Sequence, residues 1–192
     1  MLVLASASPR RRELLTQAGF EFQIHPAHIP EDPHPNEDTI AYATRLARQK
    51  AEAIFSQLSP TYPDLTVLGA DTTVTLDNHI LGKPENPEDA ARMLHLLSGR
   101  THRVITGVAL VSSAHTEVAA EATAVQFLTL SEQEISNYIA TGEPTDKAGA
   151  YAIQGHAARW IPRIEGCYFN VVGLPISLVA TLLDSFQRPA QV

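Results

Sequence analysis

Hydrophobic and polar residues follow two periods along this chain, one typical of strands and one typical of helices. The β-rich runs predict strands at 2–5, 66–76, 80–81, 103–111 and 117–128. The amphipathic runs predict helices at 8–19, 37–58, 86–99, 131–142 and 175–186. Helices and strands alternate, but hairpins stand among them. The pattern therefore favours an α/β fold with a mixed sheet over a purely parallel one.

Residue types at the ends of these runs support the assignment. Three predicted helices begin with a polar residue that can cap free backbone N–H groups, and either proline or a capping-box glutamate follows it. These starts are Ser8-Pro9, Asn86-Pro87 and Ser131 to Glu134. Asp77-Asn78 is typical of the tight turn of a hairpin. Residues 112–115 join the last two strands, most simply as an antiparallel pair.

The long helix carries a lysine at the edge of its apolar face. Glu37 and Asp38 are expected in its first turn, where negative charge is favourable. At 100° per residue, Lys50 lies at the edge of the apolar stripe, whereas Arg45 points away from it. Lys50 therefore either extends to solvent, which helix geometry alone favours, or projects into a polar cleft. The stripe comprises Ile40, Ala43, Ala47, Ala51, Ile54 and Leu58.

An aspartate stands inside the strand 66–76, where this residue type is uncommon. Alternation puts Gly69, Asp71 and Thr73 on one face, which leaves room around the carboxylate for a metal or a water. The segment Gly82-Lys83-Pro84, shortly after the hairpin turn, can return a cation to the same region. Asp71 is therefore a candidate metal ligand or general base, and the alternative is an aspartate that serves only a turn.

Three consecutive arginines, Arg10 to Arg12, stand in the first turn of the first predicted helix. Cations are unfavourable at this end of a helix, because the free N–H groups and the dipole already make it positive. A bound anion would balance the positive charges of the three arginines, and a phosphate chain is one such anion. The alternative is a solvated basic turn whose charges are screened.

A polar loop at 142–155 has glycines at both ends, a composition typical of a binding loop. It holds two carboxylates, a lysine, a tyrosine and an amide. The amide, Gln154, can donate and accept hydrogen bonds together, so it is a candidate for reading the edge of a nucleobase.

The overall charge narrows the class of partner. The chain has 192 residues, with 14 Lys and Arg against 21 Asp and Glu, and a net charge of −7. This acidity argues against DNA or RNA as a partner, because nucleic-acid binding needs a basic face. The longest apolar stretch, 171–183, is interrupted and too short to cross a membrane, and the single Cys167 fits a reducing compartment. We expect a cytoplasmic protein of one domain.

Seven short motifs follow one another along the chain. They are Ser8-Pro9-Arg10-Arg11 with Glu13-Leu14-Leu15; Lys50-Ala51; Gly69-Ala70-Asp71-Thr72; Gly82-Lys83-Pro84; Ser98-Gly99-Arg100-Thr101-His102 with Thr106-Gly107-Val108; the loop from Glu143 to Gly155; and Asn170-Val171-Val172-Gly173-Leu174-Pro175. Together they resemble the Maf family of nucleoside triphosphate pyrophosphatases, and the resemblance runs from Leu4 to about Leu183.

The resemblance implies an elongated mixed β-sheet surrounded by helices, similar to that of inosine triphosphatases, with two lobes around a cleft. Residues 1–187 would form this domain and 188–192 a C-terminal tail. It implies cleavage of a nucleoside triphosphate between the α and β phosphates, with Mg²⁺ or Mn²⁺ as the cofactor, commonly in a homodimer. The loop 146–155 resembles the branch that acts on dTTP and UTP, and modified pyrimidine nucleotides stay open as further substrates.

The same resemblance suggests roles for individual residues. Asp71 matches the catalytic aspartate, while Arg10, Thr72 and Gln154 match positions tied to substrate choice. Glu31, in the proline-rich loop, is a second candidate metal ligand beside Asp71. We expect water to attack the α-phosphorus, with Asp71 as general base or as ligand to the metal. The cations expected to neutralise the phosphates are Arg10, Arg11, Lys50 and Lys83.

Two other classes of function stay open from the sequence alone. One is a regulatory module in cell division that senses a nucleotide with little turnover. The other is a nucleic-acid-binding protein that uses the arginine turn, against which the net charge of −7 speaks.

Overall fold

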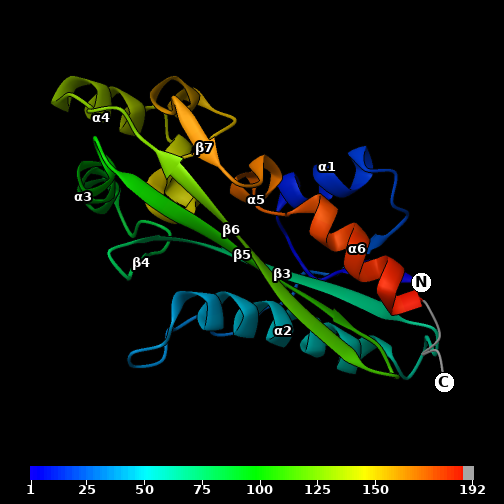
Figure 1. The fold of residues 1–192 in the computed structure, drawn as a ribbon. Helices are drawn as coiled ribbons and strands as arrows, with labels where there is room; N and C mark the ends of the chain where they lie inside the picture. Colours follow the sequence, from blue (N-terminus) through cyan, green and yellow to red (C-terminus); the bar gives the residue numbers. More distant parts are fainter. Residues whose placement is uncertain (188–192) are drawn as a thin grey trace. The chain divides into compact units, whose positions relative to one another are not determined.

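The computed structural model describes residues 1–187 and contains one β-sheet with helices packed on it (Figure 1). The expected C-terminal tail, 188–192, lies outside the described residues. The strands are β1 (Leu2–Leu4), β2 (Gln23–Ile24), β3 (Thr66–Leu76), β4 (His79–Leu81), β5 (Thr101–Val111), β6 (Thr116–Gln126) and β7 (Arg163–Glu165). The α-helices are α1 (Pro9–Gln17), α2 (Thr39–Leu58), α3 (Pro87–Leu97), α4 (Glu132–Ala140), α5 (Tyr168–Val172) and α6 (Ile176–Gln187). Three 3₁₀ helices are η1 (Glu143–Asp146), η2 (Ala148–Ala150) and η3 (His156–Trp160).

The sheet is mixed, as the sequence predicted. Among the described residues it has seven strands in the order β2-β1-β3-β5-β6-β7, with β4 paired to β3. β1 is parallel to both β2 and β3, whereas β4 is antiparallel to β3 and β7 is antiparallel to β6. β5 and β6 are neighbours joined by residues 112–115, too few for the crossover that parallel strands need. The expected antiparallel pair is therefore confirmed.

The predicted helix starts and hairpin turn are confirmed in their chemistry. Ser8 and Asn86 each accept a hydrogen bond from the backbone N–H three residues further on. Ser131 and Glu134 form the expected capping box at the start of α4. The turn Asp77-Asn78 has φ values of 50° and 63°, the left-handed conformation that a two-residue hairpin turn requires.

Two expectations for the long helix are wrong. α2 begins at Thr39 with Asp38 as its cap, so Glu37 precedes the helix instead of lying in its first turn. Ile40, placed on the apolar stripe, is 41% exposed. The buried face keeps most of the expected stripe but is wider and includes Lys50, whereas Ile40 is exposed in the first turn of the helix. The buried residues of α2 are Thr39, Tyr42, Ala43, Leu46, Ala47, Lys50, Ala51 and Ile54.

Six short elements were not expected from the sequence. They are β2, β7, α5 and the three 3₁₀ helices, each of two to five residues. The two other elements of this length, β1 and β4, were predicted, because one is an apolar run and the other follows a hairpin turn.

The chain divides into two compact units. Unit 1 comprises residues 1–71, 106–121 and the segment from Gly173 on, and unit 2 comprises 72–105 and 122–172. The strands β3, β5 and β6 each continue from one unit into the other along the chain.

Within unit 1, the backbone of α2 lies directly on two strands. A Cβ added at Gly69 of β3 would lie 2.0 Å from the carbonyl oxygen of Ala47, and one added at Gly107 of β5 would lie 2.3 Å from that of Ala43. Only glycine permits such an approach. α2 covers one face of these strands, and α1 and α6 lie on the other side (Figure 1).

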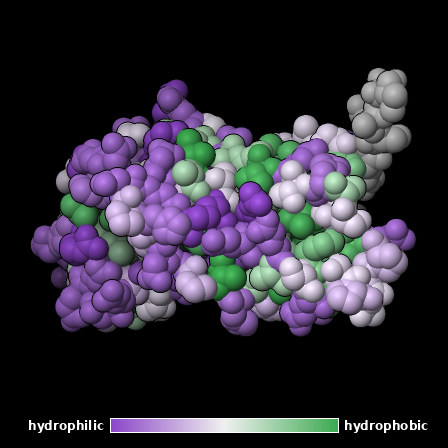
Figure 2. All heavy atoms as spheres, turned by 90° about the horizontal axis from the view of Figure 1, so that it is seen from below, coloured by the Kyte–Doolittle hydropathy of each residue, from purple (hydrophilic) through white to green (hydrophobic). Residues whose placement is uncertain are grey.

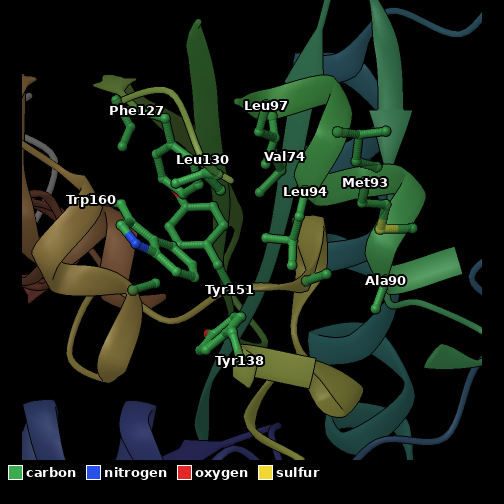
Figure 3. Close-up of a cluster of buried hydrophobic side chains, with 14 of the residues drawn as sticks. Val74, Ala90, Met93, Leu94, Leu97, Phe127, Leu130, Tyr138, Tyr151 and Trp160 are labelled. Atoms are coloured by element: carbon green, nitrogen blue, oxygen red, sulfur yellow. The ribbon is translucent and has the colours of Figure 1, made fainter. Parts of the chain in front are cut away.

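Within unit 2, an aromatic cluster fills the core (Figure 3). The rings of Tyr138 and Trp160 meet edge to face at 5.0 Å, and those of Phe127 and Tyr151 meet at 4.8 Å. The imidazole of His102, 1% exposed, shares a 2.8 Å hydrogen bond with the Tyr151 hydroxyl. Burial lowers the pKa of His102 to about 4, so this core histidine is neutral at pH 7.

The face of the molecule seen in Figure 2 is mostly hydrophilic, with hydrophobic residues in small groups. Among the described residues, no helix has the length and apolar character that crossing a membrane requires.

Replacing Gly69 with alanine should destabilise the protein strongly, because the new methyl group would overlap backbone atoms of α2 that no side-chain rotation can move. We expect a loss of roughly 3 kcal/mol and a fall in Tm of roughly 6–12 °C. Thermal unfolding followed by circular dichroism measures the change. Gly82→Ala is the control, since nothing lies within 4 Å of a Cβ at that position. Equal Tm values for the two variants would contradict the close packing.

Candidate active site

A buried ion pair joins α2 to β3. Lys50 Nζ donates a hydrogen bond to Asp71 Oδ1 at 2.6 Å, and each side chain is 10% exposed. Gly69 and Asp71 share a face of β3, so the approach of α2 at Gly69 brings the next residues of the helix over Asp71. The prediction from helix geometry that Lys50 extends to solvent is therefore wrong, because the carboxylate of Asp71 lies beneath the helix at this position. Asp71 also lies in mid-strand rather than in a turn.

Lys50 binds a second carboxylate from outside the sheet. Glu31 Oε1 lies 2.6 Å from Lys50 Nζ, and the Glu31 side chain is 47% exposed. Glu31 belongs to the segment between β2 and α2, which has neither helix nor strand. The lysine therefore bridges a buried carboxylate of the sheet and a partly exposed carboxylate of a loop.

Oxygen atoms of the protein surround the guanidinium of Arg11. Its Nε donates to the carbonyl of Gly173 at 2.8 Å, and its Nη1 donates to the carbonyl of Ala70 at 2.9 Å and to the hydroxyl of Ser6 at 3.1 Å. Burial lowers the pKa of Arg11, and the charge of Asp71 acts in the opposite direction. The positive charge of Arg11, for which the sequence predicted a bound anion, is therefore compensated by groups of the protein itself.

The other two arginines of this turn differ in exposure. Arg10 is half-buried and Arg12 is exposed. Arg10 and Arg12 thus both combine a helix N-terminus with access to solvent, and the expected contact of Arg10 with a phosphate stays a prediction.

The two carboxylates offer hard oxygen donors. Asp71 and Glu31 each place an oxygen 2.6 Å from the same nitrogen, so these two oxygens are at most twice that distance apart. Carboxylate oxygens are donors that Mg²⁺ and Mn²⁺ accept, and Mg²⁺ commonly binds through one or two carboxylates with water and substrate phosphates. Within residues 1–187, no group of three or more His, Cys, Asp or Glu side chains is placed to hold a metal. The donor set therefore fits a metal that shares its coordination with a ligand.

The remaining predicted site residues belong to unit 2. Thr72 follows Asp71 on β3 and is half-buried, whereas Lys83 and Gln154 are exposed. The N–H of Gly149 donates to the carbonyl of Gly82 at 3.0 Å, which ties the polar loop to the segment that carries Lys83. Within unit 1 the structure gathers Arg11, Glu31, Lys50 and Asp71, and within unit 2 it joins the segments of Lys83 and Gln154.

Two anchors hold the loop on either side of Gln154. The Tyr138 hydroxyl donates to the Glu143 carboxylate at 2.7 Å and accepts a hydrogen bond from the N–H of Ala152 at 3.2 Å. The same carboxylate accepts the N–H of His156 at 3.2 Å. Gln154 is thus an exposed side chain on a fixed backbone.

Several polar residues of this loop serve the loop rather than a ligand. Tyr151 lies in the core of unit 2, and burial raises its pKa. Lys147 donates to the carbonyl of Glu143 at 2.9 Å and also pairs with Asp146. The dense polar composition therefore overstates the number of residues available for binding.

Three polar residues near the ion pair were missed in the sequence. Ser6 accepts from Arg11, the Tyr42 hydroxyl donates to the carbonyl of Glu31 at 2.7 Å, and Arg45, expected to point away, binds Glu37. A spacing of four residues from Tyr42 to Leu46 to Lys50 places these side chains on one ridge of the helix, a signal that could have identified Tyr42. Nothing in the sequence pattern signals Ser6.

Comparison with known families gives a match over almost the whole chain. A family model described as Maf-like protein matches residues 1–186. The chain belongs to the Maf family.

Relatives of this Maf protein cover almost its whole length. A protein of Koribacter versatilis (strain Ellin345) is 52% identical over 182 residues, which are 95% of this chain and 92% of the relative. A protein of Aromatoleum aromaticum is 48% identical and covers 98% of this chain and 96% of the relative. One from Geobacillus sp. (strain WCH70) is 51% identical, with 92% of each chain covered. All three relatives are named dTTP/UTP pyrophosphatase.

A solved structure, the Ham1 protein of Staphylococcus aureus, shares 11% sequence identity with this Maf protein. It covers 97% of this chain and 99% of the other, with a TM-score of 0.49. At that score the likeness does not establish a shared fold, so the similarity to inosine triphosphatases stays a prediction.

Replacing Lys50 with methionine should lower the free energy of unfolding by about 3–5 kcal/mol, because a buried carboxylate loses its cation. Arg48→Met removes a similar charge from the same helix, but Arg48 and Glu52 are 57% and 41% exposed. We expect that control to lose no more than about 1 kcal/mol. Urea denaturation at pH 7 compares the two variants, and equal losses would show that the Lys50 pair is not protected from water.

Proposed function

We propose that this Maf protein hydrolyses dTTP and UTP to the nucleoside monophosphate and pyrophosphate, with modified pyrimidine nucleotides as a further substrate class. The observation that carries the proposal is the buried Lys50–Asp71 pair with Glu31 on the same lysine. A buried ion pair is seldom more stabilising than well-packed apolar residues of similar size, so stability alone gives little reason for it. The names of relatives that share about half of their residues with this chain support the same activity.

In the proposed reaction, a water oxygen attacks the α-phosphorus and forms a new P–O bond. The bond between this phosphorus and the oxygen that bridges to the β-phosphate breaks, and pyrophosphate leaves with that oxygen. Asp71 accepts a proton from the attacking water as general base, and Lys50 fixes the orientation of its carboxylate. Four cations neutralise the negative charge of the phosphates, namely Arg10, Arg11, Lys50 and Lys83.

Asp71 and Glu31 are the residues that would hold Mg²⁺ or Mn²⁺, since their carboxylates are hard oxygen donors. A bound divalent ion supplies charge that polarises a phosphoryl oxygen and lowers the pKa of a bound water. Ligation of the ion by Asp71 would be the alternative to its role as general base, and the residue type allows either.

Recognition of the pyrimidine is assigned to Gln154 and Thr72 in this proposal. Gln154 gives the sharper test, because its side chain is exposed, whereas Thr72 is half-buried and leaves β3 on the face opposite Asp71. An amide can match a base edge that carries both a donor and an acceptor.

The proposal extends to the setting of the protein. We propose a cytoplasmic homodimer with a nucleotide as its partner and no nucleic-acid partner. The single cysteine and the net charge of −7 support the compartment and the absence of a polyanionic polymer.

Asp71→Asn should lower pyrophosphate release from dTTP at least about 100-fold, because the amide keeps the shape of the side chain but cannot accept the proton. The assay uses purified protein with dTTP and Mg²⁺ and measures pyrophosphate. Asp77→Asn is the control, since Asp77 is an exposed residue of the hairpin turn. Turnover near the wild-type value in Asp71→Asn would remove Asp71 from the catalytic role. Absence of turnover in the wild-type protein would favour a nucleotide-sensing module instead.

Gln154→Ala should change the ratio of kcat/KM for dTTP to that for dCTP, dATP and dGTP. The stability of the protein should stay near that of the wild type. The side chain is exposed, so its removal leaves the core intact. Gln133→Ala, on the exposed face of α4, is the matched control. A panel of triphosphates at one Mg²⁺ concentration gives the ratio, and an unchanged ratio in Gln154→Ala would place base recognition elsewhere.

A further inference from the structure

The segment that carries Glu31 depends on donors from outside itself. Residues 30–35 include three prolines, which have no backbone N–H, so this stretch can form few hydrogen bonds of its own. It has no helix or strand, and most of its residues are exposed. The position of the Glu31 carboxylate must therefore be fixed by contacts with another element.

Tyr42 of α2 provides the first contact. Its hydroxyl donates to the backbone carbonyl of Glu31 at 2.7 Å. The tyrosine is 8% exposed, and its phenol hydroxyl serves as the donor of this contact. The contact holds the main chain of Glu31, while its carboxylate reaches Lys50.

Arg45, one turn further along α2, provides the second contact. Its guanidinium binds Glu37 in a bidentate way, with Nε and Nη2 at 2.6 and 2.7 Å from the two carboxylate oxygens. Nη2 also donates to the backbone carbonyl of Asp32 at 3.1 Å. The hydrogen bond from Arg45 lowers the pKa of Glu37 to about 2, so the pair stays ionised at any pH at which the protein is assayed.

Glu37 closes this arrangement on the loop side. One of its carboxylate oxygens accepts the N–H of His34 at 2.9 Å, and the N–H of Glu37 donates to the carbonyl of His34 at 3.1 Å. The segment from Glu31 to Glu37 is thus held near both of its ends by one face of α2. We call Tyr42, Arg45 and Glu37 the loop clamp.

We propose that Tyr42 and Arg45 are positioning residues of the reaction, which act by holding the backbone of residues 31 and 32 so that the Glu31 carboxylate meets Lys50. Neither residue contacts Lys50 or Asp71 in the reaction scheme above; their effect passes through Glu31. The same helix supplies Lys50 and the loop clamp, so one rigid element sets both partners of the Lys50–Glu31 contact. This inference rests on the proposed pyrophosphatase function.

Loss of the loop clamp should reduce activity without unfolding the protein. Tyr42→Phe removes one hydroxyl, and Arg45→Met removes the guanidinium but keeps an aliphatic chain of similar length. We expect kcat/KM for dTTP to fall about 10- to 100-fold in Arg45→Met and less in Tyr42→Phe, as for other groups that orient a ligand. Arg45→Lys should recover only part of the loss, because an ammonium cannot form the bidentate contact.

A double-mutant cycle with Glu31→Gln separates positioning from a general structural role. If the loop clamp acts through Glu31, adding Arg45→Met to Glu31→Gln should lower kcat/KM less than about twofold further. If the two losses multiply, the loop clamp does not act through Glu31 and the proposal is wrong. Arg48→Met is the matched control, since it removes an arginine of α2 whose partner is Glu52 on the same helix, and it should keep wild-type activity.

Hydrogen exchange tests the loop clamp independently of turnover. Backbone amides between 31 and 38 should exchange at least about tenfold faster in Arg45→Met than in the wild type or Arg48→Met, while those of β3 stay unchanged. Unchanged exchange in this segment would overturn the proposal. If the wild-type protein released no pyrophosphate but the exchange result held, the pyrophosphatase function would fail while the loop clamp itself stood.

Discussion

The approach of α2 to the sheet at Gly69 and Gly107 is the constraint on which the candidate site depends. With side chains at these positions, the helix would have to move away from the strands by the width of a methyl group. Lys50 would then lose its 2.6 Å contact with Asp71, because the lysine of a displaced helix could extend its ammonium group into water instead. These two glycines therefore determine whether Lys50 is exposed on the surface or buried in the candidate site.

Charge is distributed unevenly between this site and the rest of the molecule. The chain is acidic as a whole, with a net charge of −7, yet within unit 1 Lys50 and Arg11 lie beside the Asp71 strand. Lys50 is shared by two carboxylates, so its charge is already balanced before any phosphate arrives. Arg11 gives hydrogen bonds to oxygens of the protein, whereas Arg12 of the same turn is exposed. A nucleotide that binds here would have to compete for cations that the protein already uses.

The sequence predicted those features that depend on neighbouring residues. The capping box from Ser131 to Glu134 and the Asp77-Asn78 turn require only local chemistry, and both are present. The burial of Lys50 on α2 was not predictable, because it depends on the approach of the helix to glycines of two strands elsewhere in the chain. The contact of Arg45 was not predicted for a related reason: its partner Glu37 precedes the helix, whereas the periodic pattern placed Glu37 inside it. Candidate residues could thus be named from the sequence, but not the contacts that hold them.

The 2.8 Å hydrogen bond from Arg11 to the carbonyl of Gly173 spans 162 positions of the chain. Neither compact unit is one continuous segment, and unit 1 draws on the N-terminal strand and on the segment from Gly173 on. During synthesis, α1 therefore emerges from the ribosome long before the carbonyl that Arg11 binds exists. The Arg11 guanidinium therefore stays hydrated until nearly all of the chain has been made. The completion of unit 1 is thus a late, long-range event in folding.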